Sequence, residues 1–119
     1  RASDVPALAG QTSRVIVAHA DLLRTRRDVV RRYMDAYRET IDWMYSTPEG
    51  VKAYADWASV PVPVAKRTMD EFVTRVGVNP DKISDVAGVM ASAVDFKYVS
   101  APLTADQIAQ FIEIPPRRN

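Results

Sequence analysis

Residues 25–46, TRRDVVRRYMDAYRETIDWMYS, decide the fold class because their apolar side chains recur at intervals of three and four. This spacing puts the apolar side chains on one face of a helix and the charged side chains on the other. Opposite charges follow at helical spacing, as in Asp28 with Arg32 and Asp35 with Arg38, and each pair adds roughly 0.2–0.5 kcal/mol. The apolar positions are Val30, Tyr33, Met34, Tyr37, Ile41, Met44 and Tyr45.

The sequence after this helix predicts two further helices separated by a proline-rich break. Thr47 followed by Pro48 is a hydroxyl cap before a proline at the first helical position, and it predicts a short helix running to about Ala58. Val60-Pro61-Val62-Pro63 then interrupts the helical pattern, since proline disfavours helical backbone just before it. A third helix is expected over 63–76, with Gly77 as its left-handed C-terminal residue.

The same cap-then-proline signal recurs at Asn79-Pro80, and it predicts a fourth helix with an end between Phe96 and Ser100. Thr104 with Gln107 three residues later is a capping box, which predicts a last helix over 105–113. Two prolines follow this helix, and residues 115–119 are expected to form a tail.

The segment before the first helix reads differently. Residues 1–13 are small and polar and predict a tail or linker, whereas residues 14–21 begin with a β-branched run typical of a buried strand. A lone strand needs a partner, so it pairs either with another copy or with a sheet outside this chain. The fold class is therefore mainly α, with about five helices over a helical domain at 22–114 and one short N-terminal strand.

Composition narrows the function classes. The 119 residues suit a single domain, and sixteen basic against fifteen acidic residues give +1, so no global charge selects nucleic acid or an anionic membrane. The absence of cysteine removes disulfides, thiolate nucleophiles and zinc–thiolate sites. No apolar run approaches the roughly twenty residues that span a bilayer.

Four groups of residues invite a functional reading, and each is interpreted structurally. The only histidine, His19, is taken as a structural or surface residue, because no cysteine or second histidine could complete a metal site. The arginines at 24–32 are taken as a solvated helix face, and the tyrosines and tryptophans of 33–57 as core or inter-helix packing. The acids lack any metal-loop pattern, so catalytic, metal and cofactor sites are all expected to be absent.

One resemblance covers most of the chain. The stretch SRVIVAHADLLRTRRDVVRRYMDAYRETIDWMYSTPEGVKAYADWASVPVPVAKRTMDEF is similar to the closing third of periplasmic binding proteins of ABC importers for nitrate, sulfonates, taurine and thiamine precursors. The similarity spans 14–113. Gly50 departs from the family pattern, which has a second acid after Pro48-Glu49. The matching positions are Val30, Tyr33, Ala36, Tyr37, Ile41, Trp43 and Thr47-Pro48-Glu49, then Asp85, Val86, Phe96, Tyr98, Ala101-Pro102-Leu103-Thr104, Ile108, Phe111 and Ile112.

The resemblance implies that this chain is the C-terminal fragment of a type II periplasmic-binding-protein-like α/β fold. Two lobes of that fold clamp a small solute, and residues 14–21 would be a strand returning from a lobe outside this chain. Arg14 and His19, near that strand, are the expected ligand contacts, with Arg14 pairing with an anionic solute. The implied location is periplasmic, the implied partner is an ABC permease subunit, and no nucleic acid is expected.

Two further readings stay open. A free-standing helical regulatory or protein-interaction domain would suit the long first helix, and it predicts a dimer that buries one helix face. An exposed strand edge invites pairing, so a homodimer through residues 14–21 is also an expectation.

Overall fold

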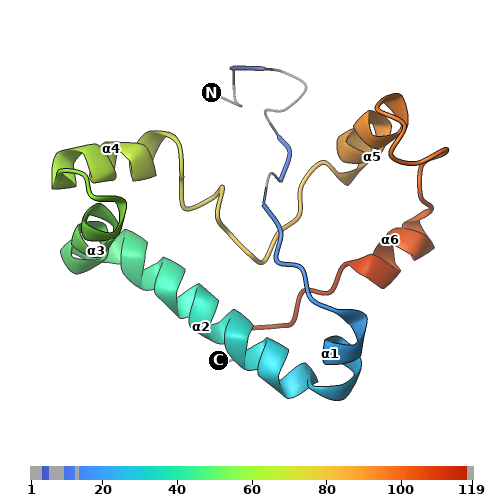
Figure 1. Ribbon diagram of the computed structural model, residues 1–119, viewed down its shortest axis with the longest axis horizontal. Coiled ribbons are helices and arrows are strands. Elements are labelled where there is room, and N and C mark those ends of the chain that lie inside the picture. Colours follow the sequence, from blue (N-terminus) through green and yellow to red (C-terminus); the bar gives the residue numbers. More distant parts are fainter. Residues whose placement is uncertain (1–3, 6–9, 13, 118–119) are drawn as a thin grey trace. The chain divides into compact units, whose positions relative to one another are not determined.

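Six helices make up the regular structure of the described residues, which are 4–5, 10–12 and 14–117 of a computed structural model. They are α1 (Ala20–Thr25), α2 (Arg27–Ser46), α3 (Pro48–Ala58), α4 (Val62–Glu71), α5 (Val86–Asp95) and α6 (Ala105–Phe111) (Figure 1). They fall into two compact units, described separately. One contains residues 14–80 and the segment from Pro115, and the other contains residues 81–114 with the described residues before Arg14. The mainly helical fold class is confirmed.

Helix α2 is the longest element and has the predicted ion pairs. Arg32 Nη2 lies 3.1 Å from Asp28 Oδ2, and Arg38 Nη1 lies 3.4 Å from Asp35 Oδ1. The helix is preceded by α1, which the sequence pattern did not predict, and the backbone breaks between the two helices at Arg26. The two short-range pairs support α2 locally, and tertiary packing buries Met34 and Ile41 of its apolar face.

Helix α3 begins at the predicted signal. The Thr47 hydroxyl oxygen accepts a hydrogen bond from the Gly50 amide at 3.1 Å, and Pro48 occupies the first turn, where its missing N–H has no cost. Gly50 is buried against the end of α2, with no room for a side chain. This close approach fixes where α3 crosses α2.

Helix α4 packs against α3 and completes the core of this unit. The helix ends at Glu71, so the predicted extent to residue 76 is wrong, and so is the left-handed role of Gly77, because no described glycine has a positive φ. The Gly77 amide instead donates to the Thr74 hydroxyl in a turn. The buried apolar residues among those described are Met34, Ile41, Ala55, Ala65 and Met69.

Helices α5 and α6 belong to the other unit. The start predicted at Asn79-Pro80 is wrong, because α5 begins at Val86 and its cap is Asp85, whose carboxylate accepts from the Gly88 amide at 3.0 Å. An acid with a left-handed backbone (φ 55°) supplies the capping oxygen that Asn79 was expected to give. The capping box at Thr104 and Gln107 is confirmed, although α6 ends at Phe111.

The predicted strand at 14–21 is not formed. Residues 14–19 are in no helix or strand, Ala20 and Asp21 already belong to α1, and the described part of the chain contains no strand at all. A β-branched run favours extended backbone, but a strand exists only where a second strand supplies the ladder of hydrogen bonds. Val15 and Val17 are exposed as a result.

The aromatic residues are less buried than expected. Tyr33, Trp43 and Trp57 are exposed, and Trp57 keeps 80% of its surface accessible, so these three do not lie in the core, and inter-helix packing stays a prediction for them. Two pairs stack on the surface of their own helix, Tyr33 with Tyr37 and Tyr54 with Trp57. Residues three or four positions apart on a helix meet whether or not another element covers them, so their spacing alone did not establish burial.

Candidate functional site

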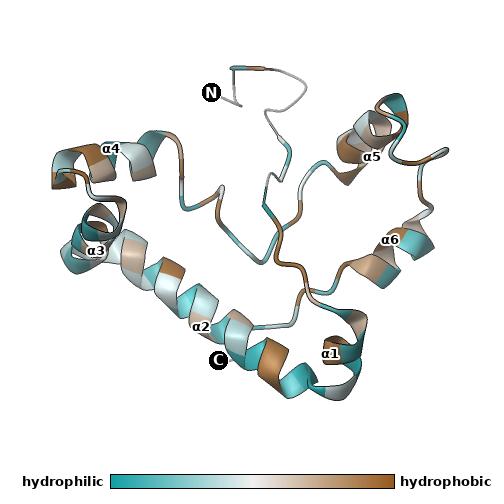
Figure 2. Ribbon diagram, viewed as in Figure 1, coloured by the Kyte–Doolittle hydropathy of each residue, from teal (hydrophilic) through white to brown (hydrophobic). Residues whose placement is uncertain are grey.

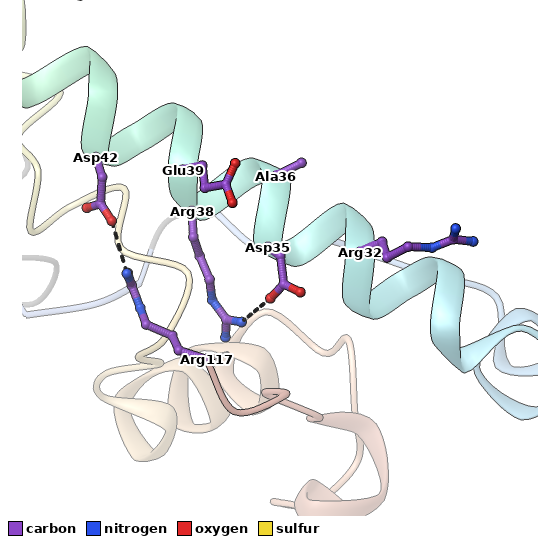
Figure 3. A pocket seen from close by; sticks show the side chains of 7 residues that line it. All are labelled: Arg32, Asp35, Ala36, Arg38, Glu39, Asp42 and Arg117. Carbon is purple, nitrogen blue, oxygen red and sulfur yellow. Dashed lines mark hydrogen bonds and ion pairs between the residues drawn. The ribbon is translucent and has the colours of Figure 1, made fainter. Parts of the chain in front are cut away.

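The most marked grouping of polar side chains lies along one side of α2, around a shallow pocket with a volume of about 380 Å³ (Figure 3). Six lining residues come from α2 and one comes from the segment after Pro115, all within one unit. Figure 3 shows Arg117 reaching to Asp42 and Arg38 reaching to Asp35. The lining residues are Arg32, Asp35, Ala36, Arg38, Glu39, Asp42 and Arg117.

Arg38 is the buried charge of this site, with 4% of its surface exposed. Its Nη2 donates to the backbone carbonyl of Pro115 at 2.5 Å, and its Nη1 lies 3.4 Å from an oxygen of Asp35. A guanidinium away from water is costly unless such partners compensate for the lost hydration. The sequence pattern places Arg38 on the charged face of the helix, and it is buried because Pro115, itself buried, covers it.

Asp42 is the carboxylate at which two arginines converge. Arg75 lies 2.5 Å from one carboxylate oxygen and Arg117 lies 3.0 Å from the other. Hydrogen bonds from Arg117 and then from Arg75 lower the pKa of Asp42 below its ordinary value, and a smaller desolvation effect opposes them. Asp42 therefore remains ionised and joins α2 both to the loop after α4 and to the C-terminal segment.

A second pocket, with a volume of about 350 Å³, lies beside these two arginines and shares Asp42 and Arg117 with the first. Its remaining lining residues are Ile41, Arg75, Val76, Asn79 and Pro80. The segment from Pro115, expected to be a tail, is thus held to α2 by a buried hydrogen bond and by an ion pair.

The chemistry of the first pocket is that of a balanced charge network. Its three arginines (Arg32, Arg38 and Arg117) meet three acids (Asp35, Glu39 and Asp42), so the lining has no net charge. Among the described residues no group of three or more histidines, cysteines and acids could hold a metal ion. The arrangement suits attachment of the C-terminal segment rather than capture of an ion by charge.

Tyr45 provides a further attachment between α2 and the loop after α4. Its hydroxyl donates to the carbonyl oxygen of Val73. Burial is the main cause that raises the pKa of Tyr45, and the charge of Arg14 acts in the opposite direction. The phenol therefore stays protonated at neutral pH and remains a hydrogen-bond donor.

Neither residue predicted to contact ligand lines these pockets. His19 is the N-cap of α1, where its Nδ1 accepts a hydrogen bond from the Asp21 amide at 3.2 Å. Arg14 is exposed. Their proposed contact with a solute stays a prediction.

Sequence reasoning missed Arg38, Asp42, Arg75 and Arg117 as a connected group. The partners of Asp42 lie 33 and 75 positions away in the chain, and helical periodicity reports only neighbours three or four positions apart. No local signal could have found these contacts.

Comparisons with protein-family models, with curated proteins and with solved structures found no match. Within the described ranges, no helix is both long enough and apolar enough to cross a membrane.

Proposed function

We propose that this chain is the C-terminal helical portion of a solute-binding protein of an ABC importer, for a small organic solute of the sulfonate, taurine, aromatic-acid or pyrimidine class. The chain itself would be scaffold. Solute would be held mainly by segments outside it, with Arg14 and His19 as the contacts supplied from this side. The complete protein would be periplasmic, would deliver solute to a permease subunit and would catalyse no reaction.

One observation carries the proposal: the two turn patterns of the resemblance coincide with helix starts. The long helix α2 ends at Ser46, and Thr47 and Pro48 then open α3 as the family pattern implies. At the other end, Ala101-Pro102-Leu103-Thr104 leads into α6 with Thr104 as its cap. The resemblance was drawn from the order of residues, so the agreement of helix boundaries supports it.

A second observation, the exposed apolar residues of α5 and α6, fits a chain that packs against further parts of a larger protein. Among the described residues, neither α5 nor α6 has a buried one, and the large apolar residues Val89 of α5, Phe96 just after it and Phe111 of α6 are exposed. Helices of ten and seven residues are marginal in water without tertiary packing. Their stability therefore calls for a further apolar surface, which the rest of a two-lobed protein would supply.

The test is the parent coding sequence and its product. The proposal expects an export signal and α/β lobes encoded ahead of Arg1, and a thermal shift of the parent protein with at least one member of a panel of sulfonates, aromatic acids and pyrimidines. The 119-residue chain should show no thermal shift with the same compounds, because it lacks the lobes that would enclose the solute. A start codon directly before Arg1 would end this proposal.

The exposed apolar residues also favour a second proposal, a free-standing helical regulatory or protein-interaction domain. Trp57 on α3 and Phe72 just after α4 are exposed and would suit a surface that binds a partner protein. This alternative expects sedimentation of the chain as a dimer that buries one of these faces. A monomer that binds no partner through them would count against it.

A further inference from the structure

Five arginines of the chain lie close together in sequence at the corner between α1 and α2. Arg24, Arg26, Arg27, Arg31 and Arg32 are all exposed, and we call this set the arginine corner. In Figure 2 the junction of the two helices is mostly teal, the colour of hydrophilic residues. Two acids lie among the arginines. Asp21 pairs with Arg24, and Asp28 is shared between Arg26 and Arg32.

Charge is distributed unevenly along the chain, although its total is only +1. Residues 14–32 contain six arginines and two aspartates, a net charge of +4, whereas residues 33–114 contain seven basic and twelve acidic residues, a net charge of −5. The N-terminus of the 20-residue helix α2 adds partial positive charge at the same corner. An anionic surface would therefore attract this corner.

The arrangement of the arginines favours a broad anionic surface over a groove. Arg27 and Arg32 are five residues apart on α2, so they lie about 140° apart around its axis. A helix that reads a nucleic-acid groove instead presents its contacts along one face. Arginines spread over this arc, together with Arg24 and Arg26 just before α2, can meet several headgroups of a broad surface together.

The neighbours of the arginine corner fit lipid headgroups as well. Leu22 on α1 and Tyr33 on α2 are both exposed beside it. An apolar side chain and a phenol next to basic residues match the boundary between headgroups and acyl chains, where tyrosine gathers and basic residues remain in the headgroup layer.

We propose that the arginine corner binds the surface of a membrane that contains anionic phospholipids. The site goes beyond the proposed function and does not depend on it, because it uses no solute contact. Binding is peripheral and electrostatic. Each arginine close to an anionic membrane contributes about a fivefold factor in affinity, and added salt screens the attraction.

The experiment is cosedimentation of the 119-residue chain with vesicles of phosphatidylcholine alone and with vesicles that also contain phosphatidylglycerol. The expected result is binding to the anionic vesicles only, reversed by added salt. Arg27→Gln with Arg31→Gln should weaken this binding about 25-fold. The matched control, Lys66→Gln with Arg67→Gln on α4, removes the same charge elsewhere and should leave the affinity nearly unchanged.

Three results would overturn the proposal. The first is equal binding to neutral and anionic vesicles, and the second is equal weakening by both double variants, since total charge would then suffice. The third is tighter binding of the chain to duplex DNA than to the anionic vesicles in the same salt, which would assign the corner to nucleic acid. Circular dichroism of both variants confirms that the helices persist, and a solute screen of the parent protein tests the importer function separately.

Discussion

Gly50 offers the sharpest test of how α3 is seated on α2. A methyl group added at its Cα would lie 2.5 Å from the Met44 Cα and 2.8 Å from the carbonyl oxygens of Met44 and Trp43. All three atoms are backbone atoms of α2, so no side chain can rotate away to make room. Gly50→Ala therefore forces α3 and the last turn of α2 apart.

The size of the effect follows from two opposing contributions. Alanine in place of glycine favours a helix by about 1 kcal/mol. Overpacking a buried contact costs typically about 1–3 kcal/mol, and a clash with backbone belongs near the upper end of that range. The expected net result is a loss of about 1–2 kcal/mol in the free energy of unfolding, opposite in sign to the helix-propensity effect.

The assay is urea unfolding followed by far-UV circular dichroism, with Gly77→Ala as the control. At Gly77 the nearest atom to an added Cβ is the Thr74 hydroxyl at 3.3 Å, which belongs to a movable side chain, so stability should change little. Gly50→Glu, which introduces the second acid of the family pattern, should be worse than Gly50→Ala. A Gly50→Ala protein at least as stable as the wild type would refute the close approach of α3 to α2.

Three further predictions concern attachment within the same unit. Arg38→Leu should lower the free energy of unfolding by about 1–3 kcal/mol, because the buried Pro115 carbonyl loses its donor. The exposed control, Arg32→Gln, should lower it by less than about 0.5 kcal/mol, and chemical unfolding of both variants makes the comparison. The pKa of Asp42 is lower in the folded protein than in the unfolded chain, so its contribution to the free energy of unfolding is present above about pH 4. This contribution is lost as the pH falls through the folded pKa. Asp42→Asn should therefore flatten the acidic part of a curve of stability against pH. Thr47→Ala removes the cap of α3, which should lower stability by about 1 kcal/mol, while Thr47→Ser should restore most of it in the same melts.

Local chemistry predicted well wherever the deciding partners are neighbours in sequence. Thr47 with Pro48 and Thr104 with Gln107 mark helix starts because a side-chain oxygen satisfies an amide only two or three residues on. The same logic failed at Asn79, since Asp85 offered a competing cap closer to the apolar run. Capping motifs identify candidates, and packing selects among them.

Partners distant in sequence account for what could not be predicted. Burial of Arg38 depends on Pro115, which lies 77 positions away, and nothing in the spacing around Arg38 distinguishes it from its exposed neighbour Arg32. The strand expected at 14–21 failed for a related reason, because a strand is defined by its neighbour and the described residues supply none.

Gly50 is a position at which the sequence pattern and the packing of two helices can be compared directly. The resemblance to the binding-protein family treats it only as a departure, a glycine where a second acid is usual. The structure supplies a reason, because any side chain at that position would meet the backbone of Trp43 and Met44. A longer residue there requires α3 to sit farther from α2. The proposed relation to the binding-protein family therefore expects a wider spacing between the corresponding helices in members that carry the acid. A compensating glycine or alanine at another point of the crossing would be the sequence sign that the close approach has been kept.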